Sequence, residues 1–211
     1  MFSVAMRTFG LVLIASLTSA AYERPLASHS IREAYFLGRR RDGTTTVFLA
    51  QYLRRLPIPT KGPHVAETEI RTPYEQVVLR ALQAPDGYSS QQAELDYRAR
   101  PDLIVVRIRI NATPTYKPSA FLSTSGGFRP ADFWQDFLIR LVQGEHEFES
   151  KKVTGRPVFS SGSKSGGGSL VGADVELEFD AKRVDSAPAI VEVLTPDGQD
   201  VRVEFDLEKL R

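Results

Sequence analysis

The segment Asp102–Asn111, with the sequence DLIVVRIRIN, decides the fold. Successive side chains of a β-strand point to opposite faces of a sheet, so one face of this segment carries an unbroken aliphatic set. That set consists of Ile104, Val106, Ile108 and Ile110. The opposite face begins with Leu103 and Val105 and then turns basic, with Arg107 and Arg109. The pattern predicts a strand that is buried on both faces at one end and meets solvent at the other.

The sequence before Asp102 carries helical signals, three of which are capping boxes. In a capping box, a Ser or Thr side chain accepts a free backbone N–H, and a Glu or Gln three residues later reaches back to the cap. The three boxes are Ser30–Glu33, Thr72–Glu75 and Ser89–Gln92. The first predicts a two-turn helix that ends at Gly38, although Ala34–Leu37 also fits a strand. The second predicts a helix up to Gln83, and the third predicts a short helix that Pro101 ends.

A further helix is expected between the first two boxes. Apolar residues recur at helical spacing from Thr44 up to Pro57, which predicts a helical hairpin with the preceding helix. The proline-rich connector Pro57–Pro63 follows. Weak alternation over His64–Arg71 then predicts a short edge strand.

The second half of the chain indicates short antiparallel strands. Alternation predicts strands over Lys151–Phe159 and Val175–Phe179. A hairpin is expected to join Ala189–Leu194 to Val201–Leu207, because Gly198 supplies the positive φ that its turn requires.

The segment Phe133–Val142 fits two structures. Its aromatic and aliphatic residues recur at helical spacing, but alternate residues of Phe137–Leu141 also share one face of a strand. We favour a strand from about Gln135, with Gly144–Glu145 as a hairpin turn, because turn-rich sequence flanks the segment on both sides.

In its run of short strands, hairpins and a Gly/Ser-rich loop, the region Pro101–Arg211 resembles the immunoglobulin-like β-sandwiches common in exported bacterial proteins. The resemblance is architectural and rests on no diagnostic motif, and such a fold hosts many unrelated functions. It implies an α+β chain in which N-terminal helices pack on an antiparallel, immunoglobulin-like β-sandwich. We divide the chain into a signal peptide (1–20), a helical region (21–100) and the sandwich region (101–211), the last two forming one compact unit.

Residues 1–20 have the features of a secretory signal peptide, namely Arg7, the short apolar run Phe9–Leu17 and small residues up to Ala21. The run is shorter than the roughly 20 apolar residues that a membrane span needs. Cleavage is expected after Ala20 or Ala21, and a buried helix or an uncleaved anchor is the alternative. The chain has no cysteine, which excludes a lipoprotein anchor and a disulfide framework and favours a bacterial source. The mature protein is therefore expected to be soluble and periplasmic or extracellular.

The charges of the chain are nearly balanced, with 27 Lys and Arg against 26 Asp and Glu. Binding to nucleic acid needs a concentrated basic surface, so we do not expect nucleic acid as a partner. No stretch after residue 20 is long and apolar enough to predict a transmembrane helix. An apolar content of 42% is enough for an ordinary globular core.

No set of residues in the sequence amounts to an active site. Ser161–Lys164 matches the S-x-x-K pattern of penicillin-recognising enzymes, but it lies in a Gly/Ser run and its partner motifs are absent from the sequence. The same run lacks the spacing of a phosphate-binding loop. The three histidines lie in different segments without a zinc-binding spacing, and no G-x-S-x-G motif marks a nucleophile. We therefore assign no catalytic, cofactor-binding or metal-binding residue and expect no cofactor.

An acidic row could suggest a calcium site: Asp174, Glu176, Glu178 and Asp180. Side chains on one face of a strand lie about 6.6 Å apart, whereas Ca²⁺ needs oxygens that converge on one point. We interpret the row as a solvated face that pairs with Arg107 and Arg109 on a neighbouring strand.

Two clusters remain. The first consists of Arg39, Arg40, Arg41, Arg54 and Arg55. We expect them at helix C-termini, where positive charge is favourable, and binding of an anionic lipid or cell-wall polymer is the functional alternative.

The second cluster consists of Phe128, Arg129, Phe133 and Trp134, beside a glycine-rich loop. Aromatic residues and arginine are typical of interface hot spots, so these four residues are the candidate partner-binding site, unless Trp134 only fills the core.

The sequence thus favours a non-enzymatic exported binding or structural module that contacts another protein or a cell-envelope component. The alternative is a small periplasmic hydrolase whose catalytic residues come from distant loops. A deep pocket with a histidine hydrogen-bonded to a carboxylate would favour the hydrolase, and an exposed aromatic patch would favour the module.

Overall fold

The computed structural model describes residues 22–40, 42–116, 131–160 and 170–211. These residues form four α-helices and two antiparallel β-sheets, so the chain has an α+β fold. The expected signal peptide, Phe128, Arg129 and the Ser161–Lys164 motif lie outside the described residues.

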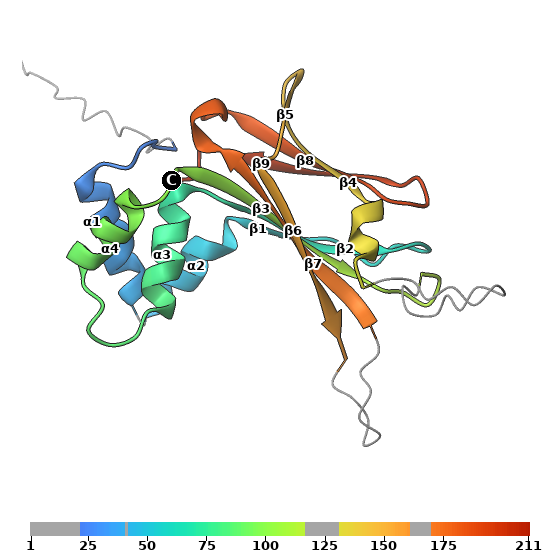
Figure 1. Ribbon diagram of the computed structural model, residues 1–211, viewed down its shortest axis with the longest axis horizontal. Helices are drawn as coiled ribbons and strands as arrows, with labels where there is room; N and C mark the ends of the chain where they lie inside the picture. Colours follow the sequence, from blue (N-terminus) through green and yellow to red (C-terminus); the bar gives the residue numbers. More distant parts are fainter. Residues whose placement is uncertain (1–21, 41, 117–130, 161–169) are drawn as a thin grey trace, which may run out of the picture.

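The segment that decides the fold is the central strand of a five-stranded sheet (Figure 1). The strands of this sheet are, in spatial order, β1 (Leu53–Arg55), β2 (His64–Arg71), β3 (Leu103–Asn111), β7 (Leu170–Asp180) and β6 (Lys152–Phe159). All neighbouring strands are antiparallel. The four aliphatic side chains on the inner face of β3 are buried, whereas Arg107 and Arg109 on its outer face are partly exposed, as the alternation predicts.

The second sheet has four strands, β5 (His146–Phe148), β4 (Leu138–Gln143), β8 (Pro188–Leu194) and β9 (Asp200–Asp206) in spatial order. The strand interpretation of Phe133–Val142 is confirmed, but the strand begins at Leu138, because Phe133–Asp136 form a 3-10 turn, η1. A second turn, η2 (Ala181–Arg183), follows β7. The hairpin of β8 and β9 is also confirmed, with a φ of +85° at Gly198.

The two sheets face each other across one hydrophobic core (Figure 1). Ile104 and Phe179 of the five-stranded sheet are at most 1% exposed, as are Leu141 and Phe205 of the four-stranded sheet. Burying side chains of this size stabilises the fold by roughly 1.5–3 kcal/mol each. Buried and outward residues alternate along these strands, so the period-2 pattern decides which face of each sheet is covered.

The helices gather at one end of the sheets (Figure 1), and they are α1 (Ser28–Arg39), α2 (Thr44–Ala50), α3 (Pro73–Gln83) and α4 (Ser90–Arg98). A second, smaller core lies among α1, α3 and α4, where Ile31, Ala34 and Val78 are fully buried. Phe48 of α2 packs against both cores. None of the described helices is long and apolar enough to cross a membrane.

The capping box predicted at Ser30 is wrong. The first helix begins two residues earlier, at Ser28, and the buried Ser30 hydroxyl donates a hydrogen bond to Glu23. Gly38 does not end this helix, which continues for one more residue. A Cβ at Gly38 would lie 2.3 Å from the carbonyl oxygen of Val78, so glycine serves the close approach of α1 to α3 and not a turn.

The helix expected from Thr44 begins there but ends at Ala50, well before Pro57. Leu53–Arg55 form β1 instead, and β1 pairs with β2. Apolar spacing over so short a stretch fits a helix or a strand, and the available partner strand decides between them. The same pairing places β2 between two strands, so the prediction of an edge strand there is also wrong.

Thr72 and Ser89 are confirmed as the N-terminal caps of α3 and α4, but neither capping box is complete, since the Gln92 side chain donates to Asp96 and not to the cap. Each hydroxyl accepts a hydrogen bond from the backbone N–H three residues later, at 3.2 and 3.1 Å. At Glu75 the reciprocal half is not formed, because both carboxyl oxygens are buried without a hydrogen-bond partner among the described residues. Burial, with the nearby charge of Glu69, raises the pKa of Glu75 well above its ordinary value, against the opposing effect of Arg71.

The helical and sheet parts of the chain are interleaved. In the sequence, α3 and α4 lie between β2 and β3, which are neighbours in the sheet. Arg211 connects the two parts by direct contacts. Its backbone carbonyl oxygen accepts hydrogen bonds from the hydroxyl groups of Tyr52, at 3.0 Å, and Thr72. Its guanidinium also binds Glu33 of α1 at 2.7 Å. Chain topology and direct contacts therefore both connect the two cores.

Candidate partner-binding groove

A cavity of about 340 Å³ lies between the two sheets, beside η1. One side comes from η1 and β4, and the other from β6 and β7. The apolar side chains that line it include Trp134, Phe137, Leu138, Val153, Val175 and Leu177. We call this cavity the Trp134 groove.

Trp134 spans the groove from η1 to β6. Its ring lies over Gly155, where a Cβ would be 2.0 Å from the ring atom Cε2. No side chain fits in that position, so the glycine allows the half-buried indole to rest against the strand. The tryptophan is thus held at the groove by a specific backbone contact.

The adjacent residue Phe133 has a different role. It is 2% exposed and packs edge-on against Phe137, with a distance of 6.2 Å between the ring centroids. Phe133 therefore anchors η1 in the sheet core and presents no surface to a partner. Of the four predicted site residues, Trp134 lines the groove, Phe133 is core, and Phe128 and Arg129 lie outside the described residues.

Two exposed aliphatic side chains complete the apolar surface around Trp134. Leu138 is 51% exposed and Val153 is 45% exposed. Sequence analysis missed both, because alternation predicts which side chains share a face but not which of them are covered. The signal that could have located this contact is Gly155, since a glycine inside a strand marks the close approach of another group.

The edge strand beside the groove is basic. Lys151, Lys152 and Arg156 are exposed along it. Lys151 lies 2.8 Å from Asp180, and its hydrogen bond holds the pKa of that carboxyl below the usual value. Exposed ion pairs of this kind contribute about 0–1 kcal/mol, so these lysines can exchange partners at small cost. Lys152 and Arg156 oppose Glu178 and Asp174, whereas Val153 and Gly155 oppose Leu177 and Val175 of the groove side. The basic side chains therefore lie on the outer face of the sheet and not in the groove.

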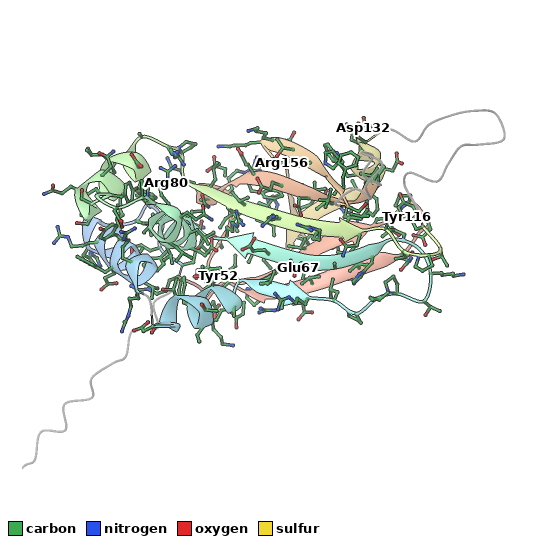
Figure 2. All side chains as sticks on the ribbon, turned by 90° about the horizontal axis from the view of Figure 1, so that it is seen from below. Tyr52, Glu67, Arg80, Tyr116, Asp132 and Arg156 are labelled. Carbon is green, nitrogen blue, oxygen red and sulfur yellow. The ribbon has the colours of Figure 1, made fainter. Side chains whose placement is uncertain are left out.

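The outer face of the five-stranded sheet, seen in Figure 2, carries charges that pair across the strands. The predicted pairing of the acidic row with the basic end of β3 is confirmed. Nη2 of Arg109 lies 2.8 Å from Oδ2 of Asp174, and Arg107 lies 3.4 Å from Asp174 and 3.9 Å from Glu176. Within the described ranges, no group of three or more His, Asp or Glu side chains is arranged to hold a metal ion.

The described histidines lie in three elements: His29 in α1, His64 in β2 and His146 in β5. His29 contacts the Ser30 hydroxyl at 3.2 Å, and that hydroxyl donates to Glu23. Ser30 is only 1% exposed, so a substrate cannot reach its oxygen. His64 contacts a backbone carbonyl oxygen at 2.9 Å. These contacts do not match the geometry that would favour a hydrolase.

The arginine cluster is distributed among separate structural contacts. Arg39 lies at the end of α1 as expected, but it donates to the carbonyl oxygen of Ala84, just after α3, at 2.9 Å. The expectation is wrong for Arg54 and Arg55, which lie in β1 and not at a helix C-terminus, and Arg55 pairs with Glu67 at 3.0 Å. Arg41 lies outside the described residues. These contacts give a structural reason for the charges that the structure describes.

Comparisons with protein-family models, with curated proteins and with solved structures found no match for this chain. The function is therefore inferred from the geometry of the site.

Proposed function

We propose that the protein is an exported, non-enzymatic binding module that takes a segment of another protein into the Trp134 groove. One observation carries the proposal: Trp134, Leu138 and Val153 form an exposed apolar surface around a cavity between the two sheets. A tryptophan supplies a large contact area at low entropic cost, which is why it is enriched among interface hot spots.

The proposal includes an immunoglobulin-like sandwich, and the strand order supports it. In the constant-type immunoglobulin plan, strands A, B, E and D form one sheet and strands C, F and G form the other. If β2 to β9 take the letters A, B, C, C′, D, E, F and G, the two sheets become β1-A-B-E-D and C′-C-F-G, with β1 as an extra strand beside A. The first two helices and β1 then precede strand A, and α3 and α4 are inserted between A and B.

The partner segment that fits best carries one aromatic or large aliphatic side chain, because the lining of the groove is mainly apolar. The apolar side chain enters the groove and packs against Trp134, Leu138 and Val153. Addition of a strand to β6 fits less well, because Pro157 has no N–H to donate and the lysines on this edge disfavour pairing. Side-chain insertion therefore supplies the main contact.

The proposed place of action rests on the signal-peptide pattern of residues 1–20. Its basic and apolar parts support export to the periplasm or beyond, so the partner is an exported protein or a protein of the cell envelope. The balanced charge of the chain disfavours nucleic acid.

Fluorescence tests the proposal directly, because Trp134 is the only tryptophan in the chain. Binders are selected from a displayed random-peptide library and titrated into the purified protein. We expect the enriched peptides to carry a large apolar residue and to shift the tryptophan emission. We also expect them to bind Leu138→Glu at least about tenfold more weakly than the wild type.

Leu95→Glu is the matched control. Leu95 is 64% exposed on α4, at the end of the molecule away from η1 (Figure 1). Its substitution adds the same charge at another exposed leucine and should leave peptide binding unchanged. Equal losses in the two variants, or binding without any change in tryptophan emission, would contradict the proposal.

A further inference from the structure

A second cavity, of about 370 Å³, lies where α3 and α4 meet the outer face of the five-stranded sheet. Leu103 and Val105 contribute to it, because the outer face of β3 is still apolar at this end and turns basic only further along. Arg80 of α3, which also lines this cavity, lies at the junction of helices and sheet in Figure 2. We call it the Arg100 cavity, after the arginine that lines it just beyond α4.

The apolar part of the Arg100 cavity comes from both the helices and the sheet. Val77 of α3 and Ala93 of α4 are buried, and Leu103 and Val105 are half-buried. The volume is at the small end of the roughly 300–1,000 Å³ range of ligand pockets. The cavity therefore suits a small molecule with one apolar side group.

Most charged groups in the cavity are already compensated within the protein. Asp96 accepts hydrogen bonds from Gln92 at 2.8 Å and from Arg80 at 2.9 Å. These contacts hold the pKa of Asp96 below its usual value, the bond from Gln92 most of all. Glu178 lies 3.5 Å from Lys152.

Arg100 and Asp102 are the charges that remain. Among the described residues, the side chain of Arg100 forms no ion pair, and the carboxylate of Asp102 accepts only the hydroxyl hydrogen of Tyr97. Both residues line the cavity, so it offers one cation and one anion to a ligand.

We propose that the Arg100 cavity binds a free α-amino acid with an apolar side chain. The Arg100 guanidinium donates to the ligand's carboxylate, and the free oxygen of Asp102 accepts from its ammonium group. The ligand's side chain packs on Val77, Leu103 and Val105. A zwitterion offers an opposite charge to both groups, whereas a simple anion or cation would pair with only one of them.

Isothermal titration calorimetry of the purified protein with L-phenylalanine, L-leucine and L-valine tests this proposal. Two analogues separate the charges, because phenylalanine amide lacks the carboxylate and 3-phenylpropionate lacks the ammonium group. We expect phenylalanine to bind and each analogue to bind at least about tenfold more weakly. Failure of all three amino acids to bind, or equal binding of either analogue, would overturn the proposal.

Variants locate the ligand. Arg100→Ala should weaken phenylalanine binding at least about tenfold, and Val105→Phe should abolish it by filling the cavity from the sheet surface. Arg156→Ala, which removes an exposed arginine of the same sheet outside the cavity, should leave binding unchanged. Equal losses in the two arginine variants, unchanged binding in Val105→Phe, or a shift in Trp134 emission on binding would overturn the proposal.

Discussion

The sheet core and the helical core of this protein use different kinds of contact. In the sheet core, large side chains such as Phe179 and Leu141 fill the space between the two sheets. In the helical core, small residues bring backbones together, because Gly38 lies against the main chain of α3 and both Ala34 and Ala81 are fully buried. The stability of the sheet core should therefore be sensitive to a loss of side-chain volume, and that of the helical core to a gain.

Loss of volume in the sheet core should have the largest effect. Phe179→Ala removes a ring that is 1% exposed. It should lower the free energy of unfolding by about 3–5 kcal/mol, because the lost transfer energy and the new cavity add. Urea melts measure this change. Phe159→Ala on β6 is the control, since Phe159 is 53% exposed and should cost less than about 0.5 kcal/mol. Similar losses in both variants would mean that β7 does not bury this face.

A gain of volume between the helices should also destabilise the protein, but by less than the loss of volume in the sheet core. Gly38→Ala places a methyl group 2.3 Å from the carbonyl oxygen of Val78 and 2.8 Å from the Cβ of Ala81. Overpacking of this kind should lower the free energy of unfolding by about 1–3 kcal/mol. In a helix without this contact, the same change would stabilise by roughly 1 kcal/mol, so the sign of the shift in urea midpoint is diagnostic. A stabilised variant would show that α1 and α3 are further apart than the structure has them.

The smallest expected effect concerns Glu75, the buried acid of the helical region. Glu69 and Arg71 face it from β2, and Tyr52 lies nearby. Because burial raises the folded-state pKa of Glu75, the unfolded chain loses this proton first as the pH rises above about 4.3, and the stability of the wild type falls. Glu75→Gln has no carboxyl group to ionise, so this fall in stability with pH is absent from the variant. It should match the wild type near pH 4 and exceed it by about 1 kcal/mol near pH 8.

Free energies of unfolding across this pH range test the prediction. Glu204→Gln, at an exposed position of β9, is the control and should follow the wild-type curve. Parallel curves for Glu75→Gln and the wild type would mean that the carboxyl of Glu75 ionises as readily in the folded protein as in the unfolded chain.

Alternation predicted the sheet core well, because side chains of a strand alternate whichever strand lies beside it. That is why β3, β7 and the β8–β9 hairpin could be placed from the sequence. The helical core depends on partners that the local sequence does not name. Serine and glycine serve helix ends and close helix contacts equally well, so Ser30 and Gly38 were assigned to the wrong role. Leu53–Arg55 became a strand only because β2 lies beside it.

The candidate site was also only partly predictable from the sequence. Trp134 was identified from the sequence as one of a set of aromatic residues, but its neighbour Phe133 points into the core. The contacts that define the groove, with Leu138, Val153 and Gly155, join segments that only the fold brings together. The apolar start of the outer face of β3 was visible in the sequence, whereas the helices that cover it were not predictable from that strand.

The insertion of α3 and α4 between two neighbouring strands has a consequence for any shortened form of the protein. A chain that begins after α4 would lack β1 and β2, so β3 would become an edge. Its nine residues would then offer a long row of unpaired backbone groups on a segment rich in isoleucine and valine. An unprotected edge of this kind is a template for aggregation. The helical region therefore cannot be trimmed away to leave a smaller soluble sandwich, because the segment that carries it also shields the strand on which the fold depends.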